Sequence, residues 1–261
     1  GQVLGLLGPN GAGKTTTLKM LTGLLTPTHG RVLVQGFDMV TERLQAQSHV
    51  GYLPETPPFY PHLTVQDHLR FVARLRHLPK AQQAQKIALV AERCHLDAVL
   101  QQYPGRLSRG YRQRRGFAMA LVHEPAVLIL DEPTTGLDPS QIQATRQLIR
   151  ELKHQHTLVL SSHLLSEVEA LCDRVIILHH GKMRAEGTPE ALRAESRPAF
   201  MLRLRPGPHA NTTLADVING LQLLSGIQRV QKVRAMAQGE QILRCEVSQA
   251  GDQAALVAPV L

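Results

Sequence analysis

Short, nearly continuous runs of aliphatic residues recur along the chain, and longer segments of mixed polarity separate them. Four such runs lie at residues 3–7, 127–130, 158–160 and 175–178. A run of this kind is typical of a strand that is buried on both faces of a sheet. The segments between the runs are long enough for helices that cross over the sheet. The pattern therefore predicts an α/β fold with a mostly parallel sheet flanked by helices.

A long helical stretch is predicted inside this alternation. Thr64 and Asp67 form an N-terminal capping signal for a helix that extends to about Arg76. From there to about residue 121 the chain is rich in Ala, Gln, Arg and Leu, which favour helix.

From about residue 196 the pattern becomes that of a second, smaller domain. It predicts strand, helix, strand, strand and the start of a helix at residues 199–205, 213–221, 227–234, 241–247 and from Asp252 onward. This order lacks one strand of a ferredoxin-like fold. We therefore divide the chain into a domain at residues 1–195 and a small α+β segment, ferredoxin-like and incomplete, at 196–261. No residue of that segment indicates chemistry.

Composition limits the class of protein. The chain has 261 residues and is 43% hydrophobic, yet its longest apolar runs are far too short to span a bilayer. No secretory signal peptide is visible, and three isolated cysteines favour reduced thiols in a cytosolic protein. Because Gly1 already lies in the first predicted strand, we expect the chain to be a fragment, truncated at both ends.

The formal net charge of +8 is compatible with binding to nucleic acid or to an anionic membrane surface. The basic residues form no block of five or more, however. We interpret the charge as a solvated basic surface and predict no nucleic-acid partner.

The strongest chemical signal follows the first predicted strand. Residues 8–16 fit the pattern of a loop that binds nucleotide phosphates between a strand and a helix. Backbone N–H groups at a helix N-terminus suit phosphate; Lys14 suits the β- and γ-phosphates, and the Thr15 hydroxyl suits Mg²⁺. The alternative is a plain glycine-rich turn. The predicted nucleotide contacts are Gly8, Pro9, Asn10, Gly11, Ala12, Gly13, Lys14, Thr15 and Thr16.

Two acidic residues end the second aliphatic run. Asp131 is placed to orient Mg²⁺ and Glu132 to polarise an attacking water. Ligands of open α/β sheets bind at that edge of the sheet. A polar turn, which the following Pro133 would suit, is the alternative. Two adjacent buried carboxylates are costly without a cation or a base role, so we favour function.

Residues 107–111, Leu-Ser-Arg-Gly-Tyr, lie between these two motifs. Here the chain resembles the ATP-binding cassette (ABC) ATPases, whose signature is Leu-Ser-Gly-Gly-Gln followed by a helix. It keeps Ser108 and Gly110 and carries Arg109 and Tyr111 at the variable positions. The resemblance implies that Ser108 and Gly110 contact the γ-phosphate of an ATP bound to the other subunit.

Other family elements follow in the expected order. Residues 135–138 match the loop that lines the dimer interface, which makes Asp138 a candidate ATP contact. His163 ends a predicted strand, as the switch histidine of the family does, and would hydrogen-bond the γ-phosphate and hold Glu132. The resemblance thus implies catalytic roles for Lys14, Glu132 and His163. Glu55 stands where the family has glutamine and would contact ATP and Mg²⁺.

The resemblance extends over residues 1–190 and implies the fold of a P-loop ATPase that binds and hydrolyses ATP with Mg²⁺. The loop around Glu55 and the signature look like those of ABC-2 type exporters, including gliding-motility and multidrug exporters. Such a subunit would form a homodimer or pair with another cassette, and drive an integral-membrane permease from the cytoplasmic face of the plasma membrane. The helical stretch, at about residues 58–122, would be the inserted subdomain that touches the permease. Candidate contacts are Tyr60, Leu63 and Phe71, which could equally be ordinary core.

Two other functions remain open at this point. The chain could be a cassette ATPase that acts on ribosomes or DNA. It could also be a regulatory cassette without catalysis, although it retains Lys14, Asp131, Glu132 and His163. The aromatic residue that stacks on adenine in the family is expected upstream of Gly1, so we expect weak binding and poor discrimination between ATP and GTP.

Overall fold

The computed structural model describes residues 1–195, 199–204, 213–223, 227–235 and 241–247. The chain divides into two compact units, Gly1–Pro189 and Glu190–Leu261. The sequence analysis placed a boundary after residue 195, whereas the units meet at the start of helix α8 (Pro189–Glu195). Each unit is described here by itself.

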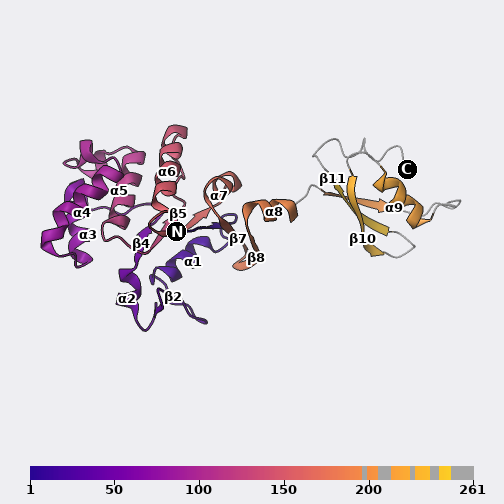
Figure 1. Cartoon of the computed structure of the whole chain (residues 1–261), viewed down its shortest axis with the longest axis horizontal. Coiled ribbons are helices and arrows are strands. Elements are labelled where there is room, and N and C mark those ends of the chain that lie inside the picture. The colour runs from indigo at the N-terminus through magenta and orange to yellow at the C-terminus, as the bar shows by residue number, and fades with distance from the viewer. Residues whose placement is uncertain (196–198, 205–212, 224–226, 236–240, 248–261) are drawn as a thin grey trace. The chain divides into compact units, whose positions relative to one another are not determined.

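A six-stranded sheet lies at the centre of the first unit (Figure 1). Its strands, in spatial order, are β4 (Val50–Leu53), β5 (Val127–Asp131), β6 (Thr157–Ser162), β1 (Val3–Leu7), β7 (Arg174–His179) and β8 (Lys182–Gly187). All neighbours are parallel except β7 and β8, which form an antiparallel hairpin. The predicted mostly parallel sheet is thus confirmed.

The strand register brings three loops to one edge of this sheet. Leu7 at the end of β1 pairs with Ser162 of β6, and Asp131 at the end of β5 pairs with Ser161 of β6. Parallel strands end on the same side, so the segments that follow β1, β5 and β6 meet there. Segments that are distant in the sequence therefore share one site.

Helices cover both faces of the sheet. Neighbouring residues of a strand point to opposite faces. In β1, Leu6 belongs to the same core cluster as Leu18 of α1 (Lys14–Leu21). On the other face, a Cβ atom added at Gly5 would lie 2.7 Å from Sγ of Cys172, which follows α7 (Leu165–Leu171). Helices α1 and α7 therefore lie on opposite faces.

The core on the α1 side extends to a smaller part of the unit. That part comprises β2 (Leu33–Val34), β3 (Phe37–Asp38) and α2 (Arg43–Ser48). The buried residues of this cluster are Leu6, Leu18, Val34, Met39, Ala46, Val50 and Ile129. Their packing fixes α1, and with it the residues at its N-terminus.

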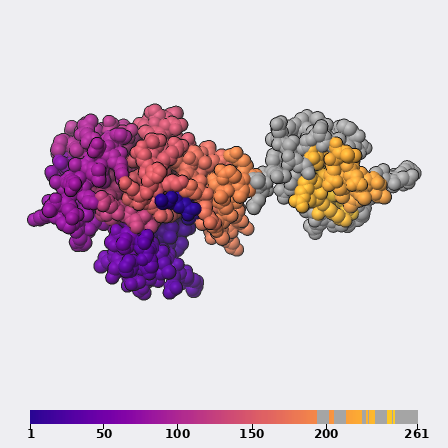
Figure 2. All heavy atoms as spheres, in the orientation of Figure 1, coloured from indigo at the N-terminus to yellow at the C-terminus, as the bar shows by residue number. Residues whose placement is uncertain are grey.

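The predicted helical stretch contains α3 (Val65–Leu75), α4 (Lys80–Arg93), α5 (Arg109–Leu121) and the short 3₁₀ helices η1 (Asp97–Val99) and η2 (Pro104–Arg106). The Thr64 side chain caps α3 by accepting from the Asp67 N–H, as predicted. The purple and magenta atoms of this stretch form a lobe at one side of the unit (Figure 2).

Helix α5 joins this lobe to the sheet. A Cβ atom added at Gly116 of α5 would lie 2.4 Å from Cδ1 of Leu53 in β4, and one at Gly51 of β4 would lie 2.2 Å from the Ala120 carbonyl oxygen. Such close approach requires glycine at both positions. The second half of α5 is therefore packed closely against β4. A further helix, α6 (Pro139–Leu152), follows the loop after β5.

The second unit has a core of its own. Strands β9 (Ala199–Leu204), β10 (Ile227–Ala235) and β11 (Gln241–Val247) form an antiparallel sheet in the order β10–β11–β9, with α9 (Leu214–Gln222) between β9 and β10 in the chain. Its buried residues are Leu221, Ile227, Val230, Leu243 and Cys245. The helix predicted from Asp252 lies outside the described residues. The ferredoxin-like assignment stays a prediction.

Candidate functional site

The loop of residues 8–13 connects β1 to α1 at the sheet edge. Gly11 and Gly13 have φ values of 79° and 102°, in the left-handed region that glycine adopts without strain. The Ala12 N–H donates to the Pro9 carbonyl at 3.1 Å, and the Gly181 N–H, from the β7–β8 turn, donates to the Ala12 carbonyl at 2.9 Å. The loop conformation is thus fixed by its own glycines and by a neighbouring hairpin.

Lys14, the first residue of α1, carries its charge into the same region. Its side chain is only 6% exposed. Nζ donates to the carbonyl oxygens of Gly8 at 2.8 Å and Pro9 at 3.3 Å, and forms an ion pair with Glu132 Oε1 at 3.3 Å. Two residues predicted from separate motifs are therefore in direct contact.

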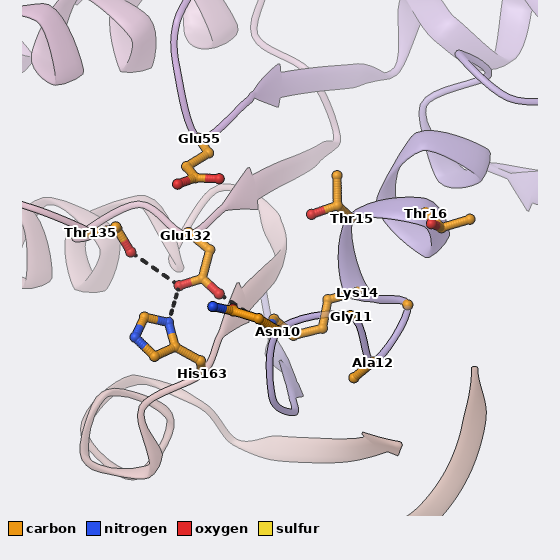
Figure 3. Close-up of a pocket in the computed structure, with 11 residues that line it drawn as sticks. Asn10, Gly11, Ala12, Lys14, Thr15, Thr16, Glu55, Glu132, Thr135 and His163 are labelled. Atoms are coloured by element: carbon orange, nitrogen blue, oxygen red, sulfur yellow. Dashed lines mark hydrogen bonds and ion pairs between the residues drawn. The ribbon is translucent and has the colours of Figure 1, made fainter. Parts of the chain in front are cut away.

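Glu132 connects three elements of the site (Figure 3). In addition to the Lys14 ion pair, its Oε2 accepts from Nδ1 of His163 at 2.8 Å and from Oγ1 of Thr135 at 3.1 Å. Its backbone has φ 47°, a left-handed conformation that is unfavourable for a residue with a side chain. A nearly buried carboxylate with three donors is held in one orientation, as a general base requires.

Asp131 lies behind Glu132 and is 2% exposed. Its Oδ1 accepts from Thr15 Oγ1 at 3.3 Å and from Ser161 Oγ at 2.6 Å, and Ser161 Oγ in turn accepts from the Glu132 N–H at 2.9 Å. Burial, followed by the charge of Asp131, raises the pKa of Tyr52 to about 12. The sequence analysis did not foresee Ser161, since a serine at a strand end carries no signal of its own.

The donor set fits Mg²⁺ held jointly with phosphate. Within the described residues no group of three or more His, Cys, Asp or Glu side chains is arranged to hold a metal. Mg²⁺ commonly takes only one or two carboxylates and completes its shell with water and phosphate oxygens. Thr15 and Asp131, in contact with each other, provide that partial set.

These side chains surround a cavity of about 350 Å³. Its walls are Asn10, Gly11, Ala12, Gly13, Lys14, Thr15, Thr16, Glu55, Glu132, Thr135 and His163. Glu55 thus faces the same space as the phosphate-loop residues (Figure 3). Three predicted residues contact this wall without lining the cavity. Gly8 and Pro9 accept hydrogen bonds from Lys14, and Asp131 accepts one from Thr15.

Comparison with known proteins agrees with this geometry. A family model described as ABC transporter matches residues 1–135, about half of the 261-residue chain. The chain belongs to the ABC transporter family. It is 38% identical to the ABC transporter ATP-binding protein NatA of Bacillus subtilis, over 76% of this chain and 81% of NatA.

Two further comparisons cover most of this chain but very different shares of the other protein. The chain is 39% identical to the probable multidrug ABC transporter ATP-binding protein YbhF of Escherichia coli over 75% of its length, but it spans only 34% of YbhF. A solved ATP-binding subunit of an ABC transporter superposes with a TM-score of 0.68 at 33% identity, covering 75% of this chain and 82% of that one. The likeness confirms the fold of a P-loop ATPase cassette.

The remaining predicted residues of the cassette lie outside the cavity walls. Ser108 caps α5 by accepting from the Tyr111 N–H at 3.4 Å, and Gly110 packs on the Gln141 side chain of α6. Asp138 caps α6, and hydrogen bonds from the Gln141 N–H and the Ser140 hydroxyl hold its pKa below the usual range. The structure therefore does not bring these three residues to the Lys14 cavity of the same chain.

A buried carboxylate that the sequence analysis missed links the loops of this cassette. Glu167 in α7 is 3% exposed and accepts from the hydroxyls of Thr134 and Ser162, the latter at 2.8 Å. Thr134 follows Glu132 in the loop after β5, and Ser162 precedes His163 at the end of β6. Glu167 thus ties together the two segments that carry the Glu132–His163 pair. In the sequence, only the spacing of four residues between His163 and Glu167 could have indicated this role.

Replacing Glu167 with alanine is expected to lower the free energy of unfolding by about 2–4 kcal/mol, because two buried hydroxyls lose their acceptor. Urea denaturation would measure this change. Glu92→Ala, an exposed position on α4, is the control and is expected to be close to neutral. Wild-type stability for Glu167→Ala would show that this link contributes little.

Proposed function

We propose that this chain is the ATP-hydrolysing subunit of an ABC-2 type membrane exporter. The observation that carries the ATP-hydrolysing role is the position of Glu132, whose carboxylate is held by Lys14, Thr135 and His163 at the wall of a phosphate-loop cavity. The exporter type rests on the loop around Glu55 and on the signature, which resemble those of ABC-2 type exporters. A base held in this way beside a phosphate loop suits the activation of water for attack on a terminal phosphate.

The roles of the chain's residues in this reaction follow from their contacts. Lys14 would neutralise phosphate charge, and Thr15 and Asp131 would hold Mg²⁺, with Glu55 facing the same space. When bound, Mg²⁺ offsets the charge that develops on the phosphate oxygens. Glu132 would accept the proton of the attacking water. His163 would keep the carboxylate aimed through the Nδ1–Oε2 hydrogen bond.

We further propose that two cassettes, as a homodimer or with a different cassette subunit, enclose the ATP molecules between them. Ser108 is exposed at the N-terminus of α5 and lies outside the Lys14 cavity. Helix N-termini with hydroxyl and N–H donors bind anions. The Ser108–Gly110 segment would therefore contact the γ-phosphate on the partner subunit, and Asp138 would lie at the interface.

The proposed permease contact is on the helical lobe. Tyr60 and Phe71 are 50% and 41% exposed, and their rings pack edge to face with centroids 5.5 Å apart. Aromatic residues are enriched in the cores of protein interfaces relative to the rest of the surface. Within the described residues no helix is both long and apolar enough to cross a membrane. The chain would work at the cytoplasmic face of the membrane. NatA and YbhF, both ABC transporter ATP-binding proteins by name, do not favour the alternative of a cassette that acts on ribosomes or DNA.

This proposal can be tested by fractionation of the chain co-expressed with the product of the neighbouring open reading frame. We expect ATPase activity, recovery in the membrane fraction, and loss of that recovery in the Tyr60→Ala/Phe71→Ala variant. Tyr103→Ala, at a 44% exposed tyrosine elsewhere in the lobe, is the matched control. Co-sedimentation with ribosomes instead of membranes would contradict the exporter assignment and favour the alternative.

A further inference from the structure

Arg109 lies between Ser108 and Gly110, the two residues proposed to contact phosphate, and its side chain reaches the loop after β5. It is the first residue of α5, directly after the cap Ser108. Its Nη2 donates to the Thr135 carbonyl oxygen at 2.7 Å. The contact joins the signature segment to the loop that supports Glu132, within one chain.

The guanidinium also occupies the space beside Gly136. A Cβ atom added at Gly136 would lie 2.2 Å from Cζ of Arg109, and 2.4 and 2.5 Å from its two terminal nitrogens. Gly136 has φ 70°, so glycine is favoured there by its backbone as well as by Arg109. The planar group thus lies directly against the turn that follows Thr135.

A second side chain of α5 holds the same loop. Gln113 is one helical turn after Arg109, and residues four apart share a helix face. Its Nε2 donates to the Pro133 carbonyl oxygen at 2.9 Å, and the residue is 7% exposed. Helix α5 therefore binds the loop at two carbonyl groups, those of Pro133 and Thr135.

Thr135 passes this restraint to the carboxylate. Its carbonyl accepts from Arg109, and its hydroxyl donates to Glu132 Oε2 at 3.1 Å. Thr135 also lines the cavity. A displacement of the signature end of α5 would thus move the group that orients Glu132.

We propose that Arg109 is a positioning residue that makes hydrolysis at Glu132 depend on the placement of the signature segment. This inference rests on the proposed function. If Ser108 binds the nucleotide held by the partner subunit, Arg109 would couple that contact to the Glu132 site of its own chain. Binding of one ATP would then orient the base that acts on the other ATP. Gln113 anchors the loop, and Arg109 is the part of the anchor that lies next to Ser108.

The test is a double-mutant cycle on the full chain, with kcat, KM and nucleotide affinity measured for each variant. Arg109→Met removes the donor, and Thr135→Val removes the hydroxyl that faces Glu132. Each is expected to lower kcat by about 10- to 100-fold, as small misplacements of a reacting group do, with nucleotide affinity and melting temperature unchanged. The double variant should be no slower than the slower single variant, because both changes break one link. Arg109→Lys, which keeps a donor and the charge, should recover part of kcat.

Arg106→Met, at an exposed arginine in η2, controls for the loss of a nearby positive charge and is expected to leave kcat unchanged. Additive effects in the cycle, a lower melting temperature that accounts for the loss, or an equal effect of Arg106→Met would overturn the inference. If the wild-type chain hydrolyses ATP and the Arg109→Met variant is fully active, the inference is overturned but the proposed function stands. A wild-type chain without ATPase activity would overturn both.

Discussion

Replacing Lys14 with alanine is expected to abolish ATP hydrolysis and to weaken nucleotide binding by roughly 2–4 kcal/mol, the range for a lost charge-assisted contact with a buried anion. Lys14 is the only cationic side chain in the loop of residues 8–16. Its Nζ is already placed by the carbonyl oxygens of Gly8 and Pro9. Because the lysine is already ordered before nucleotide binds, binding costs little side-chain entropy at this position. Removing the lysine therefore loses most of the energy of its interaction with the phosphates.

Titration calorimetry with ATP and a phosphate-release assay would measure both effects. The expected loss corresponds to a dissociation constant raised by about 30- to 1,000-fold. Lys19→Ala, at an exposed position further along α1, is the charge-matched control and should change neither quantity appreciably. Unchanged activity in Lys14→Ala would refute the phosphate-loop assignment.

Replacing Glu132 with glutamine is expected to lower turnover by at least about 100-fold while ATP still binds. The amide keeps the shape of the side chain but cannot take a proton from water. It also turns one acceptor oxygen into a donor. That donor must then face either Lys14 Nζ or both of the donors at Oε2, His163 Nδ1 and Thr135 Oγ1. With hydrolysis blocked, the ATP-bound pair of cassettes should accumulate.

Single-turnover hydrolysis and size-exclusion chromatography with ATP and Mg²⁺ would check this result. His163→Ala helps to separate the roles, since it removes one hydrogen bond to the carboxylate but leaves the carboxylate itself. We expect that variant to retain more activity than Glu132→Gln. Normal hydrolysis by Glu132→Gln would exclude Glu132 as the base and make His163 the next candidate.

Much of the fold and the centre of the site could be predicted because their signals are local. The strand, glycine loop and helix around Lys14 are contiguous, and the carboxylates of Asp131 and Glu132 directly follow an aliphatic run. The parallel sheet then brings these segments together, since strand ends meet at one edge.

The support of the site could not be predicted in the same way. Ser161 and Glu167 bond to partners that are distant in the chain, and neither residue type marks such a role in a strand or a helix. Thr135 belongs to a motif that the sequence analysis recognised. Its hydrogen bond to Glu132, however, depends on a turn geometry that could not be predicted from the sequence. The domain boundary after residue 195 stays a prediction; the two compact units divide the chain at Pro189, within α8.

The left-handed backbone of Glu132 sets two selective pressures against each other. A non-glycine residue in that conformation costs on the order of 1 kcal/mol of folding stability, and at φ 47° glycine would avoid the strain. In a cassette that binds nucleotide but no longer hydrolyses it, only the contacts with Lys14, Thr135 and His163 would favour glutamate there over glycine. We therefore expect position 132 to drift early, toward glycine or asparagine, in lineages released from hydrolysis. The backbone conformation of this chain disfavours glutamate at position 132, and continued selection for hydrolysis would retain it there.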